Sequence, residues 1–552
     1  MNKSFTKGSR GKLFNFFNVN RKGQPPLFLL LIASITALGM ILPPVYLVLR
    51  ATQSGVDEFL SILTRSRTLE TIFNTLSMVA GITLLAVLVA VPLAFLTART
   101  DLPGKRFWLV ATTLPLAIPT YVGSFALLAF AGPRGSVLQI ILEPLGVDRL
   151  PSVYGWFGVV VVIGLLTYPY IMLTVRAALL GMNPSLEEAA RSLGYSQRET
   201  FFRITFPQLK PAIASGSLLV ALYSIQDFGT PAMLRFDSFT RVIFTQYRSA
   251  FDRTLAASLA LVLMLLVMGI LLLEFKLRRA GAAYYTTNSG AMKPPTIIPL
   301  GRWKWVALLF VSFIVFLTLV IPVGVILFWL FRSTLFGGVG YTSFQAVPLW
   351  EIVWNSIYAA GLGALVATIF AIPIAILSVR FRNRFTTILE RCSYIGFGTP
   401  GIVIALALVF FGSSYAQFIY QEMPMLAFAY LVLFLPQAVG TIRGSLLQVN
   451  PSLEESAHSL GRNSWQTFRE ITLPLVRSGI ISGAMLIFLT AMKELPATLI
   501  LAPIGFKTLA TQIWQATAED AAFATAAEAS LLILLISSVS TWIILSQEKR
   551  AS

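Results

Sequence analysis

Long runs of apolar residues are the feature that most limits how this chain can fold. They begin near residues 27, 75, 107, 154, 211 and 255, and again near 304, 355, 388, 424, 476 and 522. An α-helix rises about 1.5 Å per residue, so roughly twenty apolar residues cross the ~30 Å hydrocarbon layer of a bilayer. Because 56% of the 552 residues are hydrophobic and 12% are charged, the composition excludes a soluble fold. We predict an all-α integral membrane protein with about twelve transmembrane helices.

The chain contains one motif twice. Residues 183–194 read NPSLEEAARSLG and residues 450–461 read NPSLEESAHSLG, so ten of the twelve positions match. Each copy is followed at the same spacing by an Ile-Thr-x-Pro sequence, which ends at Pro207 in the first copy and at Pro474 in the second. The two copies are therefore related by a constant offset of 267 residues. The agreement indicates an internal duplication.

The two halves also align outside this motif. Residues 74–99 align without gaps on residues 355–380, but here the offset is 281. The difference predicts an insertion in the first half within residues 132–152, which we expect to form a short helix on the outer surface. The whole pattern predicts two parallel six-helix repeats related by an axis along the membrane normal. The predicted organisation is a basic segment 1–26, a first half 27–276, a linker 277–303 and a second half 304–546.

Basic residues predict the orientation of the chain. The first 26 residues contain six Lys or Arg and no acid, and so does the segment from Lys276 to Lys304. Cytoplasmic loops retain Lys and Arg, so we place both segments in the cytoplasm. Both termini and both copies of the motif then lie on the cytoplasmic face, because each half has an even number of spans. The expected location is the bacterial inner (cytoplasmic) membrane, in a multi-pass arrangement.

Composition also argues against several function classes. The single cysteine, Cys392, and the single histidine, His458, supply neither a disulfide nor the ligands of a haem or His-rich metal centre, and we assign no metal site. A membrane enzyme would require clustered acids, histidines or a nucleophile near one interface. The formal net charge of +18 is explained by cytoplasmic loops facing anionic membrane lipids, so we expect no nucleic-acid partner.

The repeated motif predicts a helical hairpin over residues 183–207 and again over 450–474. In the first copy, Ser185 and Glu188 fit a capping box, and Gly194 stands where a left-handed residue ends a short helix. A second helix is expected to begin at Ser196 and to stop at Pro207, which lacks a backbone donor. The second copy repeats the pattern with Ser452, Glu455, Gly461, Asn463 and Pro474.

Such a hairpin carries apolar side chains without a core of its own. They are Leu186, Leu193, Tyr195, Phe201 and Phe202 in the first copy and Leu453, Leu460, Trp465 and Phe468 in the second. An external groove would cover them, whereas the alternative is that each hairpin packs under its own helix bundle. Duplication at one topological position favours the external groove.

The motif resembles the signature of bacterial type I ABC importer permeases, which reads Glu-Ala-Ala, three residues, Gly, nine residues and Ile-x-Leu-Pro. The resemblance implies the type I permease fold, with each hairpin a coupling helix seated in one of two copies of an ABC ATPase subunit. Ser456 and Phe206 depart from the signature, but neither change removes a charge or the glycine. The matching positions are Glu188, Ala189, Ala190, Gly194, Glu455, Ser456, Ala457 and Gly461.

The energy source is expected to lie on another polypeptide. The chain contains no G-x-x-x-x-G-K-[ST] phosphate loop, so we predict a transport subunit that is not itself an enzyme. No cofactor is expected on this chain, and ATP would be used by the partner. An ion-coupled secondary transporter also has twelve spans in two halves and remains the alternative machine, but it has no use for two ATPase-docking hairpins.

Fusion of two permease halves resembles the ferric-iron importers and, less closely, the thiamine importers. The run KELPATLIL at residues 493–501, followed by Gly505-Phe506 and by residues 508–511, is similar to a characteristic run of the ferric permeases. This resemblance implies ferric iron as cargo. A separate periplasmic or lipid-anchored binding protein would deliver it, because the outer loops are too short for a receptor domain. Thiamine, sulfate and polyamine remain alternative cargoes.

Two carboxylates are candidates for the translocation path. Asp227 and Glu494 are 267 residues apart, at equivalent positions about 16 residues into the spans that begin near 211 and 476. A charged side chain in the middle of a bilayer costs ~2.5–3.5 kcal/mol, so its duplication suggests a watery cavity or a buried partner. Fe³⁺ prefers oxygen ligands. In the alternative interpretation, Glu494 pairs with Lys493 or with a facing helix, and Asp227 caps an outer helix end near Gly229 and Pro231.

Overall fold

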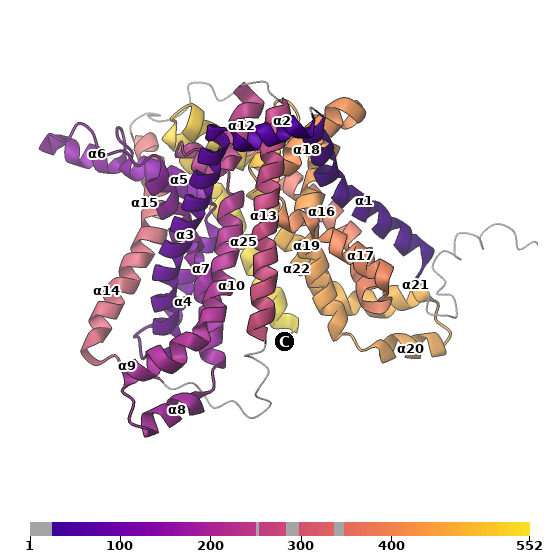
Figure 1. Cartoon of the computed structure of the whole chain (residues 1–552), viewed down its shortest axis with the longest axis horizontal. Coiled ribbons are helices and arrows are strands. Elements are labelled where there is room, and N and C mark those ends of the chain that lie inside the picture. Colours follow the sequence, from indigo (N-terminus) through magenta and orange to yellow (C-terminus); the bar gives the residue numbers. More distant parts are fainter. Residues whose placement is uncertain (1–24, 54, 250–252, 283–296, 336–346, 552) are drawn as a thin grey trace, which may run out of the picture. The chain divides into compact units, whose positions relative to one another are not determined.

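The computed structural model describes residues 25–53, 55–249, 253–282, 297–335 and 347–551. Within these residues every regular element is helical, apart from one isolated backbone bridge between Thr100 and Ile298. The predicted all-α fold is therefore confirmed. Figure 1 shows the helices with the labels used below.

The helices form two compact units. We call one the first-hairpin unit, which combines Arg50–Ala346 with Thr511–Leu534, and the other the second-hairpin unit, which combines Met1–Leu49, Val347–Ala510 and Leu535–Ser552.

The first-hairpin unit contains the long helices α3, α7, α10 and α13, to which shorter helices are attached. Its helices are α2 (Val56–Thr64), α3 (Ser66–Arg99), α4 (Lys105–Thr113), α5 (Thr120–Ala131), α6 (Val137–Leu142), α7 (Trp156–Gly181), α8 (Pro184–Ser192), α9 (Gln197–Thr200), α10 (Phe206–Gln226), α11 (Gly229–Met233), α12 (Phe239–Ser249), α13 (Arg253–Ala282), α14 (Lys304–Val315) and α15 (Ile321–Leu335).

The second-hairpin unit repeats much of this order. Its helices are α1 (Leu27–Thr52), α16 (Leu349–Arg380), α17 (Arg384–Ser393), α18 (Gly401–Tyr415), α19 (Met423–Gln448), α20 (Pro451–Ser459), α21 (Ser464–Thr467), α22 (Leu473–Met492) and α23 (Pro496–Leu501). Two further helices, α24 (Leu509–Trp514) and α25 (Phe523–Ala551), begin in one unit and end in the other.

The compact units are not the same division as the duplicated sequence halves. Helix α1, at the start of the chain, packs in the second-hairpin unit, where the Tyr46 ring lies edge-on to Phe411 and the Tyr46 hydroxyl donates to the Phe410 carbonyl at 3.2 Å. Helix α15 packs in the first-hairpin unit, where Trp329 and Phe523 have ring centroids 5.1 Å apart. Each unit therefore takes in helices from both halves of the sequence.

Nine of the described helical segments are long and apolar enough to cross a bilayer, and the bent pair of 105–117 and 120–131 would supply a tenth. The predicted spans near 211 and 388 are not among these ten and fall on α10 and on α17 with α18. The outer faces of the spans carry exposed apolar side chains, such as Phe73 and Leu309, which are 70% and 71% exposed. Such surfaces suit contact with lipid.

The predicted third span of each half, near residues 107 and 388, falls on helices that are interrupted at a proline. The chain bends by 97° between residues 105–117 and 120–131, and Pro119 stands at the start of α5. Pro400 stands in the same way at the start of α18. Proline disfavours a helical conformation in the residue before it, and both Ile118 and Thr399 are extended. The inserted segment of the first half does contain the predicted short helix, α6, which lies at the end of its unit away from α8 (Figure 1).

Close helix contacts in both units depend on glycine. A Cβ atom on Gly216 of α10 would lie 2.8 Å from the Cα of Ile171 on α7. A Cβ atom on Gly483 of α22 would lie 2.4 Å from Oγ1 of Thr441 on α19. Small residues let helix backbones approach closely in membranes, so these two positions allow α10 to pack closely against α7 and α22 against α19.

Candidate functional site

The first helix of each hairpin begins two residues earlier than the predicted capping box. Asn183 is the N-cap of α8, and its side-chain oxygen accepts from the Ser185 backbone N–H at 3.0 Å. Asn450 caps α20 in the same way, accepting from Ser452 at 3.1 Å. The predicted caps Ser185 and Ser452 are therefore wrong. The reason is that proline follows each asparagine and is well suited to the first helical position.

The predicted glycine turn is confirmed in both copies. Gly194 has φ +90° and Gly461 has φ +85°, which is the left-handed region. The Gly194 N–H donates to the Arg191 carbonyl at 3.0 Å, and the next N–H, of Tyr195, donates back to the Ala190 carbonyl at 3.1 Å. The second copy makes the same two bonds. This pair of bonds closes the C-terminal end of a helix, so each hairpin turns at a fixed angle.

The second helix of each hairpin has the predicted caps but not the predicted end. Ser196 and Glu199 form a reciprocal capping box, as do Asn463 and Gln466. Helix α9 does not stop before Pro207, however. It continues through a π-helical turn, η4 (Phe201–Thr205), into α10, and η9 (Phe468–Thr472) leads likewise into α22. A π turn accommodates a disturbed hydrogen-bond ladder, so proline here widens the helix without ending it.

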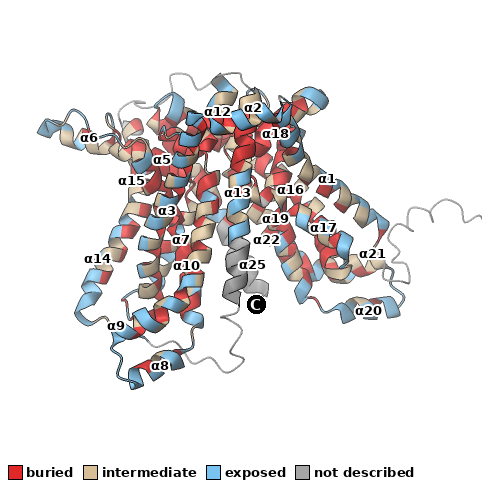
Figure 2. Ribbon diagram, viewed as in Figure 1, coloured by how far each residue is buried: buried red, intermediate tan, exposed pale blue. Residues whose placement is uncertain are grey.

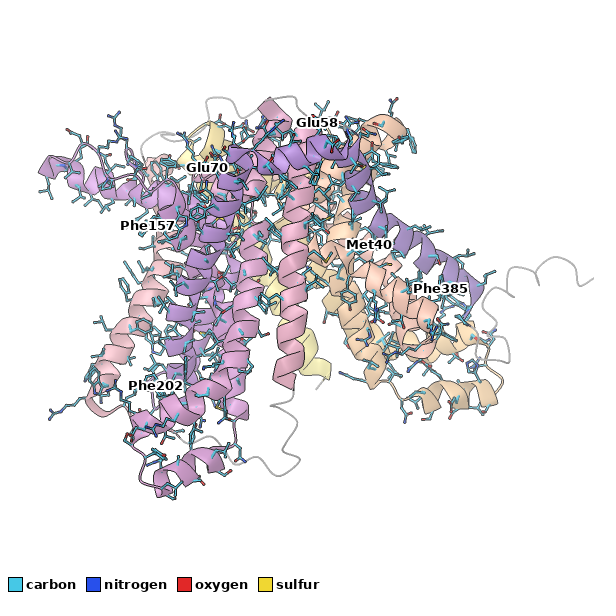
Figure 3. All side chains as sticks on the ribbon, viewed as in Figure 1. Met40, Glu58, Glu70, Phe157, Phe202 and Phe385 are labelled. Carbon is cyan, nitrogen blue, oxygen red and sulfur yellow. The ribbon has the colours of Figure 1, made fainter. Side chains whose placement is uncertain are left out.

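The hairpins are exposed, and so is most of their apolar surface. Figure 2 shows α8 and α20 largely in the colour of exposed residues. Leu193 is 79% exposed and its equivalent Leu460 is 85% exposed. Phe202 is 57% exposed and is labelled in Figure 3. Phe201 and Phe468 are partial exceptions, because both are half-buried, and the Phe201 ring packs edge-on against Phe95 of α3 with centroids 5.3 Å apart. The chain's described residues therefore leave these side chains largely uncovered.

The residues that match the importer signature divide into outward and inward positions. Glu188, Ala189 and Gly194 are exposed in the first copy, whereas Ala190 is 3% exposed. Glu455, Ser456 and Gly461 are exposed in the second copy, whereas Ala457 is 4% exposed. The signature thus combines an outward acidic position with a small residue that lets the helix lie against its own unit.

The neighbouring glutamate, which the sequence analysis did not select, turns inward. Glu187 forms an ion pair with Arg99 at the end of α3, with Nη2 and Oε1 2.8 Å apart, and the Arg99 side chain is 2% exposed. The same Glu187 oxygen accepts from the Thr205 hydroxyl at 2.9 Å. One carboxylate therefore connects the end of α3, helix α8 and the turn that leads into α10.

The second copy contains the same arrangement. Glu454 pairs with Arg380 at the end of α16, with Nε and Oε2 2.9 Å apart, and accepts from the Thr472 hydroxyl at 2.9 Å. Arg380 also donates to the carbonyl of Val449 at 3.2 Å. A signal for these residues was present in the sequence, because Arg99 aligns on Arg380 and the Glu-to-Thr spacing is the same in both copies.

The structure places both candidate path carboxylates at helix breaks rather than inside a helix. Asp227 directly follows the last residue of α10, and its side chain accepts from the Thr230 backbone N–H at 2.9 Å. Glu494 follows the end of α22, and its Oε1 accepts from the Ala497 backbone N–H at 3.1 Å. Each carboxylate thus binds the first turn of the short helix that follows, which agrees with the capping alternative for Asp227.

The two carboxylates differ in one contact. Asp227 also accepts a hydrogen bond from the Thr120 hydroxyl, at the start of α5. The equivalent of Thr120 is Gly401, which has no side chain to donate and which approaches Glu494 so closely that a Cβ would lie 2.5 Å from Oε1. The Glu494 Oε2 atom is buried and has no hydrogen-bond partner among the described residues. Glu494 and Asp227 lie in different compact units.

No group of three or more His, Cys, Asp or Glu able to hold a metal ion occurs among the residues that were described and searched. The site comprises two exposed helical hairpins, each held by a largely buried ion pair, and two carboxylates at duplicated helix breaks.

Known proteins with sequences similar to this chain are permease components of transport systems. Residues 90–278 and 367–552 match the model of the family described as binding-protein-dependent transport system inner membrane component. The chain is 34% identical over 94% of its length to the Fe(3+)-transport system permease protein FbpB 2 of Haemophilus influenzae, and covers 98% of that protein. It is 25% identical over 80% of its length to the ferric transport system permease protein FbpB of Actinobacillus pleuropneumoniae, and covers 65% of that protein.

Relatives with other cargoes match shorter parts of the chain. The molybdenum transport system permease protein ModB of Escherichia coli is 33% identical over 26% of this chain and 64% of its own length. Among solved structures, a bacterial alginate ABC transporter in complex with its alginate-bound periplasmic protein has a chain that matches with a TM-score of 0.39, 18% identity and coverage of 48% of this chain and 96% of that chain.

Proposed function

Because this chain belongs to the binding-protein-dependent transport system inner membrane component family, with both of its halves matching the family model, we propose that it is the fused permease of an ATP-driven ferric-iron importer. The observation that carries the cargo is the 34% identity to an Fe(3+)-transport permease along nearly the whole length of both proteins. The relatives of sulfate and molybdenum systems match only about a third of the chain or less.

In this proposal each hairpin docks into one subunit of a partner ATPase dimer on the cytoplasmic face. The exposed acidic positions Glu188 and Glu455 and the exposed Leu193 and Leu460 supply the contact surface. The Gly194 turn sets the angle between the two helices of the hairpin. Closure of the ATPase dimer on ATP would move both hairpins and with them the spans that they enter, α10 and α22.

The candidate path in this proposal uses the two helix breaks. Asp227 and Glu494 bring carboxylate oxygens to equivalent positions, and oxygen donors suit Fe³⁺ passing as cargo. Glu494 is the stronger candidate of the two, because within the described part of the chain its Oε2 has no hydrogen-bond partner, whereas the Asp227 side chain is held by both Thr120 and Thr230. A separate extracytoplasmic binding protein would deliver the iron.

The proposed topology places the protein in the inner membrane with both termini in the cytoplasm. The basic segments 1–26 and 276–304 support it, because Lys and Arg are retained on that side. Accessibility of single cysteines introduced at residue 189 and in α6 tests it in intact cells. Labelling of α6 alone from outside is expected, and labelling at residue 189 from outside would reverse the orientation.

The test of cargo is uptake of labelled ferric iron in cells that lack this chain and then regain it. We expect uptake to be lost, restored with the chain, and abolished when ATP is depleted. Thiamine is included as competitor. Unchanged iron uptake together with lost thiamine uptake would transfer the assignment to thiamine, and uptake that follows an ion gradient without ATP would indicate a secondary transporter.

The test of docking is recovery of an ATPase polypeptide with the affinity-purified chain. We expect Glu188→Ala combined with Glu455→Ala to reduce recovery of the ATPase and to abolish uptake, while the amount of chain in the membrane stays unchanged. Glu470→Gln is the matched control, because Glu470 lies in the second hairpin but pairs with Arg462 at the exposed surface. Normal ATPase recovery with the double variant would exclude this role for the two acids.

A further inference from the structure

The ion pairs Arg99–Glu187 and Arg380–Glu454 are largely buried, and the docking role of the hairpins does not explain them. Glu187 and Glu188 are neighbours on α8, and adjacent residues on a helix point about 100° apart. Glu188 is exposed, whereas Glu187 faces Arg99 and Thr205. The two consecutive acids of the motif therefore lie on different faces of one short helix, one exposed and one turned inward, and in the second copy Glu455 and Glu454 divide in the same way.

Each inward glutamate connects three segments that are distant in the sequence. Glu187 joins helix α8 to Arg99, which ends α3, and to Thr205, which precedes α10. In the other unit, Glu454 makes the same connections to Arg380 and Thr472. The offset between Arg99 and Arg380 differs from the offset between the glutamates, so the two arrangements formed with different chain lengths between their members and still arrived at one geometry.

We propose that Arg99 and Arg380 are positioning residues of the importer, each of which fixes a hairpin to the end of a transmembrane helix so that movement of the hairpin moves that helix. The proposal rests on the proposed docking of the hairpins to an ATPase. Burial supports it, because the Arg99 side chain is 2% exposed and that of Arg380 is 15% exposed, and a charge in such a place is held by its partner.

The charge is needed in addition to the packing. The hydroxyls of Thr205 and Thr472 donate to the two glutamates. Replacement of a glutamate by glutamine would keep the shape of the side chain and an oxygen that accepts this bond. The substitution would remove the attraction between the carboxylate charge and the guanidinium and, at Glu454, one of the two oxygens that accept. An ion pair with a planar guanidinium has a preferred direction, which suits a connection that must transmit movement rather than merely fill space.

The ion pair of Arg99 with Glu187 is more enclosed than that of Arg380 with Glu454. The Ile298 backbone N–H donates to the Arg99 carbonyl at 2.7 Å, and the Leu300 N–H donates to the Asp101 side chain at 2.8 Å. Ile298 also lines the small cavity, about 40 Å³, that Arg99 and Glu187 share. The end of the linker between the halves thus lies over the first ion pair, which explains why Arg99 is less exposed than Arg380.

The test uses Glu187→Gln and Glu454→Gln in the full-length chain, studied with its ATPase in membrane vesicles. Hydrogen exchange of hairpin amides reports attachment, and the ratio of labelled ferric iron transported to ATP hydrolysed reports transmission. We expect each variant to remain in the membrane at normal levels, its own hairpin to exchange at least about threefold faster, and the transport ratio to fall by a similar factor, with the larger effect for Glu187→Gln.

Glu470→Gln is the matched control, because it removes an acid of the second hairpin whose ion pair is exposed. It should change neither measurement. Arg380→Lys keeps the charge and should recover part of the transport ratio that Arg380→Met loses, which a purely packing role would not produce.

Unchanged hairpin exchange in Glu187→Gln and Glu454→Gln would overturn the attachment, and faster exchange with an unchanged transport ratio would overturn the transmission. Failure of the proposed function has a different signature. In that case the unaltered chain would show no ATP-driven iron uptake at all, whereas hydrogen exchange would still respond to both substitutions.

Discussion

Replacement of the turn glycines by alanine tests the hairpin geometry most directly. Gly194 and Gly461 have φ +90° and +85°, and a Cβ atom added to either would meet no atom within 4 Å. The cost of Gly194→Ala or Gly461→Ala is therefore confined to the left-handed backbone, which is ~1–2 kcal/mol for an L-residue. A cost of that size changes the population of a folded turn by a factor of about 5–30.

Hydrogen exchange measures this population locally. The Tyr195 amide donates to the Ala190 carbonyl only when Gly194 is left-handed, and the Arg462 amide donates to Ala457 in the second copy. We expect Gly194→Ala to accelerate exchange at Tyr195 about 5–30-fold, from the free-energy cost above, and to leave exchange at Arg462 unchanged. ATP-dependent iron uptake should fall with the same substitution, because the hairpin then spends less time in its docking geometry.

Two controls separate backbone conformation from other effects. Gly194→Asn should exchange more nearly like the unaltered chain, since asparagine tolerates the left-handed region. Gly181→Ala, at the end of α7, also faces open space but does not have a positive φ, and alanine should be harmless there. If the alanine and asparagine variants at Gly194 both exchange at the unaltered rate, the left-handed turn does not control the hairpin and the reasoning fails.

Three further predictions follow from duplicated positions. The Ser196 N–H and hydroxyl donate to Glu199 and hold its pKa below the ordinary value of 4.5. The stability that this capping adds to the helix is fully present above pH 4.5 and is lost as the pH falls through the lower pKa of the folded state. Protection of the Ser196 amide should therefore drop in acid, while that of Asn463, which donates to Gln466, should not. Glu494→Gln should reduce iron uptake more than Asp227→Asn, because Thr120 donates to Asp227 whereas the equivalent Gly401 has no side chain to donate to Glu494. Equal effects on uptake would contradict this reasoning. Gly216→Leu and Gly483→Leu should lower the yield of folded chain, because overpacking a close contact costs ~1–3 kcal/mol, whereas Gly269→Leu, in open space, is the control.

The local features of the site were largely predictable from the sequence. Gly194 and the second capping box of each hairpin have short-range causes, so a few neighbouring residues suffice to predict them. The first caps were predicted wrongly because Ser185-x-x-Glu188 and Asn183-Pro184 are both good helix starts, and the rigid proline favours the second. The end of α9 was predicted wrongly because Pro207 is accommodated by a π turn.

The ion pairs that hold the hairpins could not be predicted from neighbouring residues. Arg99 lies 88 residues before Glu187, and nothing local distinguishes Glu187 from Glu188 as the inward acid. That choice depends on which face of α8 lies against the ends of α3 and α10. An alignment of the two halves shows that Arg99 matches Arg380 and that the Glu-to-Thr spacing is repeated, but it does not show that these side chains meet.

The sequence by itself determined that the chain is helical, spans a membrane and is duplicated, because the length of apolar runs and the repetition of a motif do not depend on how the helices pack. It also determined the family, through the spacing of acids and glycine in the hairpins. The tertiary structure decided which side chains of each hairpin face outward, how Asp227 and Glu494 are held at helix breaks, and which helices form each compact unit. These depend on contacts between residues far apart in the chain, such as Tyr46 with Phe411, and only packing in three dimensions selects them.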